Sequence, residues 1–294
     1  MAEQNREQCP PEKGPALGGA TPIQKVVVIG AGWVGRQIVG QCAAHGVSVW
    51  WVDKSEHALQ SGIQWLGGSE SPWEKMVAPV VACRSLADTP DEIDLVIESV
   101  SEQISVKRQV FKEVSKRYDS HVIVASNSSY FTPSMLKRFV ESPERFSHLH
   151  FHVPVWRTKL VDIASCDETS AEVLERLQSF AARIGQHALV QRVENPGYVF
   201  NWMLKSLLQS ALQLKANGVA SPEEIDFAWK QVTNMELGPF GIMDQIGIDL
   251  IHQTMSAGRF VDGDAVWQPL IDQLQPLIDA NKLGVKTGEG FYKH

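Results

Sequence analysis

Short apolar runs alternate with amphipathic stretches over residues 23–194 of the chain. Runs rich in Val, Ile and Leu predict buried strands of a parallel sheet at 25–29, 47–52, 94–97, 121–125, 147–153 and 187–190. Amphipathic stretches, for instance 105–118 and 170–184, predict helices between these strands. Strands that alternate with helices are typical of a doubly wound α/β sheet of the Rossmann type.

The pattern becomes helical after Glu194, where Asn195-Pro-Gly interrupts the chain. Apolar residues recur at helical spacing over 200–211, and a capping-box sequence begins at Ser221. Two more amphipathic stretches run over 242–255 and 267–280. We therefore expect three parts, which are a disordered tail over 1–22, an α/β domain over 23–194 and an all-α domain over 195–294.

Composition narrows the class of protein. The chain has 294 residues, 44% of them hydrophobic and 21% charged, which is ordinary for a globular protein. A net charge of −7 argues against a broad nucleic-acid interface, and no apolar run is long enough to span a bilayer. The cysteines, Cys9, Cys42, Cys83 and Cys166, show neither close pairing nor metal-ligand spacing. With no signal peptide evident, we expect a cytoplasmic protein without disulfides.

A glycine-rich turn follows the first predicted strand. Its sequence is Gly30-Ala-Gly32-Trp33-Val34-Gly35, which fits G-x-G-x-x-G between a strand and a helix. The first glycine allows a tight turn, the second lets the backbone approach a pyrophosphate, and the third lets the helix pack closely on the strand. The pyrophosphate then lies at the N-terminus of the helix, which favours an anion. This context indicates a dinucleotide site rather than a turn without a ligand.

Asp53 ends the second strand of this unit. A carboxylate at that position accepts hydrogen bonds from both ribose hydroxyls and repels a 2′-phosphate. We therefore expect NAD rather than NADP, although Lys54 is adjacent. The alternative is that Asp53 is only a solvated turn residue.

Several motifs in order resemble the 3-hydroxyacyl-CoA dehydrogenase family, which includes gulonate dehydrogenase (lambda-crystallin) and carnitine dehydrogenase. They are Asp94-Leu-Val-Ile-Glu98, Ala125-Ser-Asn-Ser-Ser129, Leu149-His-Phe-His-Val-Pro154, Lys159-Leu-Val-Asp162, Pro196-Gly-Tyr-Val-Phe-Asn201, Gly238-Pro-Phe-Gly241 and Lys286-Thr-Gly-Glu-Gly-Phe-Tyr292. The resemblance covers the chain from about Ile23 to its end. It implies an NAD-dependent dehydrogenase whose helical domain forms a homodimer.

The resemblance also implies roles for individual residues. His150 matches the general base that takes the hydroxyl proton, and a histidine suits this role because it titrates near neutrality. Asp162 matches the glutamate that hydrogen-bonds the other ring nitrogen of the base. Ser129 and Asn201 match residues that hydrogen-bond the reacting substrate oxygen.

The same resemblance places further residues beside the cofactor. Glu102, Lys107 and Lys286 match residues near the nicotinamide side of the cofactor. Ser129 is expected to contact the cofactor as well. Without the resemblance, the position of His150 near the carboxyl end of a predicted strand already favours a site, because ligands bind at that edge of such sheets.

His148, His150 and His152 alternate, so on a strand they would share one face. Clustered imidazoles bind zinc, but no further cysteine or carboxylate cluster accompanies them, and we expect no metal. His152 is interpreted as a polar substrate contact or as a residue that lines the strand end. Trp156, Arg157 and Trp202 are further candidate substrate contacts, with Arg157 suited to a carboxylate.

The chain departs from the family pattern at three places. At the first, Asp162 replaces a glutamate; at the second, Val153 replaces an asparagine and the adjacent His152 replaces a phenylalanine; the third is the segment after Asp53. The segment after Asp53 is short and lacks the basic helix that grips coenzyme A.

We therefore expect an enzyme that interconverts a small-molecule 3-hydroxy compound and its 3-oxo form, on a substrate other than a plain acyl-CoA. The alternatives are an acyl-CoA dehydrogenase with fewer coenzyme A contacts, and an NAD(H)-binding sensor or structural protein without turnover.

Overall fold

The computed structural model describes residues 21–119, 121–262 and 264–294. The tail predicted over residues 1–22 lies outside the described residues, apart from Thr21 and Pro22. Contacts within the chain divide it into two compact units, the first ending at Tyr198 and the second beginning at Val199. Within the described residues, no helix is both long and apolar enough to cross a lipid bilayer.

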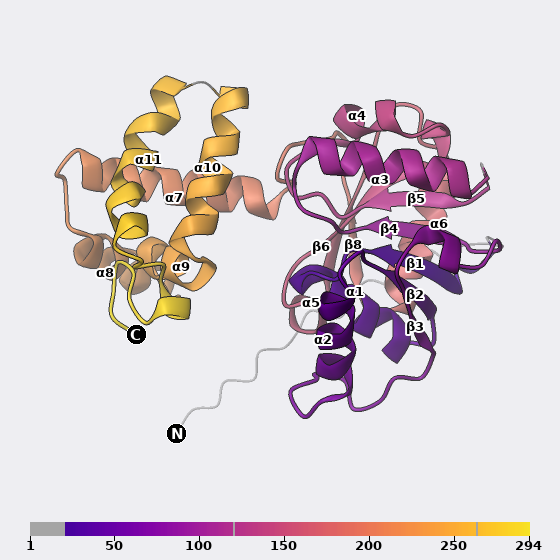
Figure 1. The fold of residues 1–294 in the computed structure, drawn as a ribbon. Helices are drawn as coiled ribbons and strands as arrows, with labels where there is room; N and C mark the ends of the chain where they lie inside the picture. Colours follow the sequence, from indigo (N-terminus) through magenta and orange to yellow (C-terminus); the bar gives the residue numbers. More distant parts are fainter. Residues whose placement is uncertain (1–20, 120, 263) are drawn as a thin grey trace. The chain divides into compact units, whose positions relative to one another are not determined.

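The first unit is built on an eight-stranded sheet in the order β3-β2-β1-β4-β5-β6-β7-β8 (Figure 1). The strands are β1 Lys25–Ile29, β2 Ser48–Val52, β3 Val80–Cys83, β4 Leu95–Glu98, β5 Ile123–Ser126, β6 Phe146–Phe151, β7 Leu160–Ser165 and β8 His187–Val190. Neighbouring strands are parallel except β6 and β7, which are antiparallel. The predicted doubly wound Rossmann-type sheet is confirmed.

Helices cover both faces of this sheet. They are α1 Trp33–Ala44, α2 Glu56–Gly67, α3 Ile104–Arg117, α4 Pro133–Leu136, α5 Val155–Thr158 and α6 Ala171–Arg183, with short 3₁₀ turns η1 Leu86–Asp88, η2 Lys137–Phe139 and η3 Pro143–Arg145. Residues of α1, α2 and α6 form one apolar cluster with the sheet, and residues of α3 and α4 form another on the opposite face.

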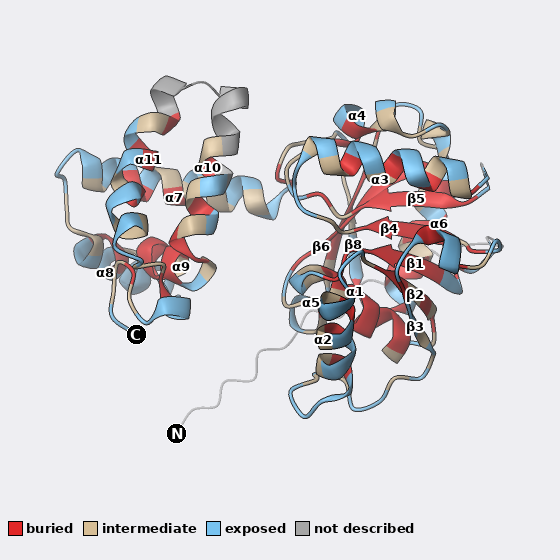
Figure 2. Cartoon of the chain, in the orientation of Figure 1, coloured by how far each residue is buried: buried red, intermediate tan, exposed pale blue. Residues whose placement is uncertain are grey.

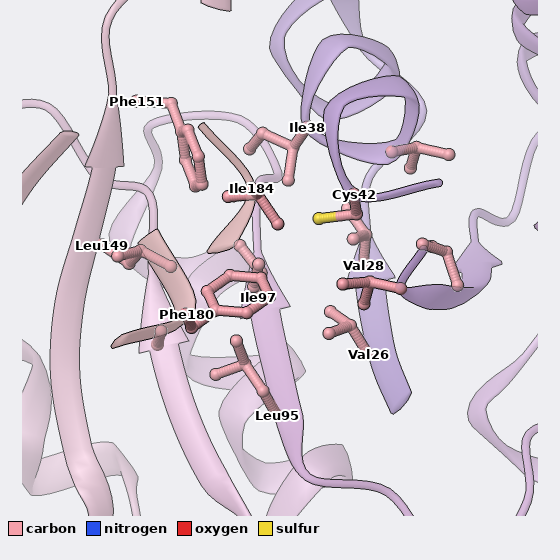
Figure 3. Packing of buried hydrophobic residues seen from close by; sticks show 14 of the residues in the cluster. Val26, Val28, Ile38, Cys42, Leu95, Ile97, Leu149, Phe151, Phe180 and Ile184 are labelled. Carbon is pink, nitrogen blue, oxygen red and sulfur yellow. The ribbon is translucent and has the colours of Figure 1, made fainter. Parts of the chain in front are cut away.

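The buried strands lie between these two clusters (Figure 2). Figure 3 shows part of the first, where Ile38 and Cys42 of α1 and Phe180 of α6 pack on Val28 and Ile97 of the central strands. Fully burying a side chain of this size contributes about 1.5–3 kcal/mol. The clusters therefore fix the central strands, whose carboxyl ends carry the polar groups described below.

Two strands of the sheet were not predicted. Strand β3 lies at the sheet edge, where most of its residues are not buried, so it lacks a buried apolar run. Strand β7 is buried but carries Asp162 in the middle of its apolar sequence. The strand predicted to reach Val153 ends at Phe151 instead.

The second unit is helical, as predicted. Its elements are α7 Phe200–Ala216, α8 Pro222–Thr233, α9 Pro239–Ile246, α10 Ile248–Asp262, α11 Asp264–Asp279 and the turn η4 Val285–Thr287. The capping box at Ser221 is present, with its side chain accepting from the backbone of Glu224. The single helix predicted over 242–255 is wrong, because Gly247 at φ 107° separates α9 from α10.

A buried carboxylate joins the end of the chain to this helical unit. Asp244, which is 1% exposed, accepts backbone N–H groups of Phe291 and Tyr292 at 2.8 Å each. Around it, Phe240 and Met243 of α9 pack with Trp267 and other apolar residues. The C-terminal segment is therefore part of the folded unit.

Candidate active site

The glycine-rich turn has the geometry that a dinucleotide requires. Gly30 has φ 115°, and a Cβ there would lie 2.3 Å from the Ser99 carbonyl oxygen, so only glycine fits. A Cβ at Gly35 would lie 2.0 Å from the Gly30 carbonyl oxygen. At Gly32 an added Cβ meets nothing within 4 Å, which leaves space beside the N-terminus of α1. The turn therefore fits a pyrophosphate at the helix N-terminus.

Asp53 lies directly after β2 and connects two loops at this site. One carboxylate oxygen, Oδ2, accepts the backbone N–H of Ala31 at 2.7 Å, and Oδ1 accepts that of Ser55 at 2.8 Å. These bonds leave further acceptor capacity on both oxygens, because each carboxylate oxygen has two lone pairs. The side chain is therefore held in place at the end of β2 by backbone N–H groups of the two loops.

The antiparallel pairing of β6 and β7 brings the predicted base and its carboxylate together. His150 and Asp162 are direct partners in the register of the two strands. His150 Nδ1 lies 3.2 Å from Asp162 Oδ2, and His150 Nε2 lies 3.1 Å from the Ser129 hydroxyl. When Nδ1–H donates to the carboxylate, the Nε2 lone pair faces Ser129 and is available to accept a proton.

Tyr198 forms one wall of this array, and the sequence analysis assigned it no role. Its ring stacks on His150 with centroids 4.5 Å apart and an interplanar angle of 11°. Its hydroxyl donates to the Ser128 carbonyl at 2.6 Å and lies 2.9 Å from His148 Nδ1. Burial and the negative charge of Asp162 raise the pKa of Tyr198 well above its ordinary value, so the phenol remains neutral.

The environment of His150 adjusts its proton affinity. Burial lowers the pKa of His150 below the ordinary value of 6.5; the hydrogen bond that the ring donates to Asp162 raises it, and the neighbouring His152 lowers it again. The imidazole is 4% exposed and is therefore neutral at physiological pH. A neutral imidazole with a free Nε2 lone pair is the form that a general base needs.

His152 also reaches the carboxylate, although it follows the last residue of β6. Its Nε2 lies 2.7 Å from Asp162 Oδ2, the same oxygen that faces His150. We call His150, His152 and Asp162 the His150 cluster. Their donor atoms lie within 4.8 Å of one another, a spacing open to a divalent cation, yet the carboxylate oxygen already faces both rings.

A second cluster lies beside the first and contains Glu98, Glu102 and Lys107; we call it the Lys107 cluster. Glu98 and Lys107 are buried, whereas the Glu102 side chain is 37% exposed. Lys107 is 1% exposed, and its Nζ lies 2.8 Å from Glu98 Oε1 and 3.2 Å from Glu102 Oε2. Burial would raise the pKa of Glu102, but the charge of Lys107 and the hydrogen bond from Ser128 lower it overall. Glu98, which the sequence analysis did not select, is the carboxylate that compensates the buried ammonium group.

The predicted substrate residue Trp156 belongs to a group of four tryptophans. Trp65 contacts Trp33, Trp73 and Trp156 with ring centroids 5.6, 5.9 and 6.0 Å apart, and the Arg36 guanidinium lies over the rings of Trp33 and Trp65. The group joins the start of α1 to α2 and α5. The sequence analysis did not predict this grouping.

The remaining predicted residues lie outside this group. Arg157 is exposed at the end of α5, and Val153 is 45% exposed. Asn201, Trp202 and Lys286 belong to the second unit, where Asn201 and Trp202 lie in the first turn of α7 and Lys286 pairs with Asp249.

The comparisons with known proteins agree with this geometry. Residues 25–194 match the family model described as the NAD-binding domain of 3-hydroxyacyl-CoA dehydrogenase, and residues 197–294 match the model of its C-terminal domain. The mitochondrial hydroxyacyl-coenzyme A dehydrogenase of Sus scrofa is 32% identical over 92% of this chain and 91% of its own length. A 3-hydroxybutyryl-CoA dehydrogenase of Bradyrhizobium diazoefficiens is 31% identical over 94% of this chain and 97% of its own.

Solved structures resemble the chain over a similar extent. A diketoreductase described for dual catalysis of dicarbonyl compounds has a TM-score of 0.83 and 31% identity, covering 93% of this chain and all of its own. The (S)-3-hydroxybutyryl-CoA dehydrogenase of Ralstonia eutropha has a TM-score of 0.82 and 28% identity, covering 92% and 99%. The chain belongs to the 3-hydroxyacyl-CoA dehydrogenase family and is an NAD-dependent oxidoreductase.

Proposed function

We propose that the protein interconverts a 3-hydroxy compound and its 3-oxo form, with His150 as the general base. The observation that carries the proposal is the array in which Ser129, His150 and Asp162 follow one another within hydrogen-bonding distance. In oxidation, His150 Nε2 takes the hydroxyl proton while the hydrogen on the same carbon leaves as hydride. Bound NAD supplies the hydride acceptor, and in the reverse direction protonated His150 returns the proton to the oxygen.

Residues around this array would orient the reaction. The Ser129 hydroxyl, 3.1 Å from His150 Nε2, would hydrogen-bond the reacting oxygen. The imidazolium formed in oxidation would be stabilised by the buried Asp162 carboxylate. Gly30, Gly32 and Asp53 would hold the dinucleotide at the other end of the site.

The segment after Asp53 supports a substrate other than a plain acyl-CoA. Helix α2 contains neither lysine nor arginine, so it offers no cation for a phosphate group. The loop that follows is anchored to α1, because the Trp73 ring covers Gly40 and its indole N–H donates to Gln41 Oε1 at 3.0 Å. The diketoreductase that resembles this chain is described as acting on dicarbonyl compounds.

The test is a substrate panel followed by NADH absorbance. It should contain 3-oxo acids, aromatic and aliphatic diketones, and acetoacetyl-CoA, with His150→Ala as the control. We expect turnover of an uncharged or carboxylate-bearing ketone at a higher kcat/KM than the coenzyme A thioester, and loss of that turnover in the control. A preference for the thioester would contradict the substrate proposal. NADH binding with no turnover of any panel member would contradict the dehydrogenase proposal.

We also propose that the protein is a homodimer formed through its helical unit. Large apolar side chains remain exposed on α7 and α8, among them Phe200, Met203, Phe227 and Val232. Large exposed apolar side chains that gather on one surface are typical of subunit interfaces. Light scattering should give about twice the chain mass of 32.6 kDa, and the monomer mass at micromolar concentration would contradict the proposal.

A further inference from the structure

The carboxylate beside the proposed base serves two imidazoles through one oxygen. Asp162 Oδ2 lies 2.7 Å from His152 Nε2 and 3.2 Å from His150 Nδ1, so the shorter contact is made to the residue that is not the base. The two rings are 4.8 Å apart and nearly perpendicular. Asp162 is 1% exposed and His152 is 9% exposed, so water has little access to the carboxylate as a competing hydrogen-bond donor.

Two N–H donors on one carboxylate oxygen divide its acceptor strength. A buried carboxylate that faces a single imidazole N–H directs its negative charge to that ring and stabilises the imidazolium. A second donor on the same oxygen withdraws part of that charge and also fixes where the oxygen lies. His152 thus affects His150 in two ways, by orienting Asp162 and by weakening the support that Asp162 gives to the protonated base.

We propose that His152 is a positioning residue, whose Nε2–H holds the Asp162 carboxylate between two imidazoles and limits how strongly that carboxylate supports His150 as the base. This inference rests on the proposed function of His150. It assigns His152 to the proton chemistry rather than to the substrate contact that the sequence suggested.

Other groups around His150 are accounted for in the test. Asp162, His152 and Glu102 affect the charge of His150 directly, and the Tyr198 ring stacks on it. His148 interacts with both His150 and Lys107. Substituting His152 leaves all the others in place. Any change in the titration of His150 is then due to the lost N–H donor and the lost imidazole.

Two variants separate the effects of His152. His152→Phe removes the donor and keeps an aromatic ring, whereas His152→Gln keeps an N–H near the position of Nε2. His187→Gln, on the exposed start of β8, is the matched control. For each protein, NMR of ring-labelled histidine follows the titration of His150, which is assigned with His150→Gln. Kinetics give kcat and KM against pH on the substrate that the panel identifies.

We expect His150 to titrate at higher pH in His152→Phe, because Asp162 then serves one ring. We expect kcat to fall about tenfold with little change in KM, because Asp162 is then no longer held in place, and this loss of orientation outweighs its stronger support of the protonated base. His152→Gln should restore most of kcat, and His187→Gln should match the unmodified protein. An unchanged titration of His150 in His152→Phe, or a change confined to KM, would overturn the inference.

The NMR measurement needs no substrate, so the two proposals fail separately. A shifted titration without turnover in any variant would leave the role of His152 standing and contradict the proposed function. Turnover together with an unshifted titration of His150 would support the proposed function and contradict the role of His152. Loss of activity on treatment with a chelator would also overturn the inference, because His150, His152 and Asp162 would then act as metal ligands.

Discussion

The Lys107 cluster and the His150 cluster lie at the same edge of the first unit's sheet, with strand β5 between Glu98 on β4 and His150 on β6, yet their charges are arranged in opposite ways. Glu98 ends β4 and is paired with Ser126 of β5, which is in turn paired with His148 of β6. The Lys107 cluster holds a buried ammonium between two carboxylates. The His150 cluster holds one carboxylate between two imidazoles.

This difference separates a group that keeps its charge from a group that can change it. A buried ion pair has to remain ionised, because an unpaired buried charge costs several kcal/mol. Burial lowers the pKa of the His150 imidazole, which is therefore neutral and can accept a proton that the reaction releases. The first cluster should therefore matter most to folding, and the second to turnover.

The largest effect should follow loss of the buried ammonium. Lys107→Met keeps the length of the side chain but leaves Glu98, which is fully buried, without its cation. We expect the free energy of unfolding to fall by about 3–5 kcal/mol, measured by urea denaturation. Lys112→Met, at an exposed position of the same helix α3, is the control and should change it by less than about 0.5 kcal/mol. Equal stability of the two variants would remove the distinction between the clusters.

The second-largest effect should be a loss of turnover without a loss of stability. His150→Gln should lower kcat/KM by about a thousandfold, since general-base catalysis contributes factors of this order. The urea midpoint and NADH affinity should stay close to those of the unmodified protein, because glutamine can still donate to Asp162. A variant that lost its folded structure together with its activity would mean that the His150 cluster is also structural.

The same contrast explains what sequence reasoning could and could not supply. The Rossmann-type sheet and its helices were predictable, because buried strands, amphipathic helices and the glycine-rich turn all leave local patterns. The array of Ser129, His150 and Asp162 was anticipated through the resemblance, and the structure brings these residues within hydrogen-bonding distance.

Interactions that depend on strand register were not predictable. Strand β7 was missed because Asp162 interrupts its apolar pattern, and without β7 the convergence of His152 on that carboxylate cannot be deduced. Tyr198 reaches His150 through a left-handed backbone conformation, φ 55°, that no local pattern signals for a tyrosine. In the sequence, Glu98 is only the polar residue at the end of a strand, and its pairing with Lys107 becomes evident in the structure.

A third variant tests the shared carboxylate itself. Asp162→Asn keeps the shape but removes the negative charge, so both imidazoles face a neutral amide in place of an anionic acceptor. We expect kcat/KM to fall about 10- to 100-fold, and the titration of His150 to move to lower pH, because Asp162 raises the pKa of that ring. This direction is opposite to that expected for His152→Phe. If both variants moved the titration the same way, burial rather than the carboxylate would dominate the cluster.

The smallest effect needs no substitution, and it concerns the direction of catalysis. Oxidation requires neutral His150 and reduction requires the protonated form. The same imidazole should therefore limit oxidation at low pH and reduction at high pH. Since burial places the pKa of His150 below its ordinary value of 6.5, oxidation should be lost as the pH falls through a value below 6.5. Reduction should be lost as the pH rises through the pKa of the same imidazole, because kcat/KM reports the enzyme free of substrate.

Profiles of kcat/KM between pH 4.5 and 9 in both directions would measure this, with enzyme stability checked at each pH. Each limb should change about tenfold per pH unit, as expected for a single proton. An oxidation limb above pH 7 would instead mean that another group accepts the proton, and the contrast between the two clusters would then need a different base.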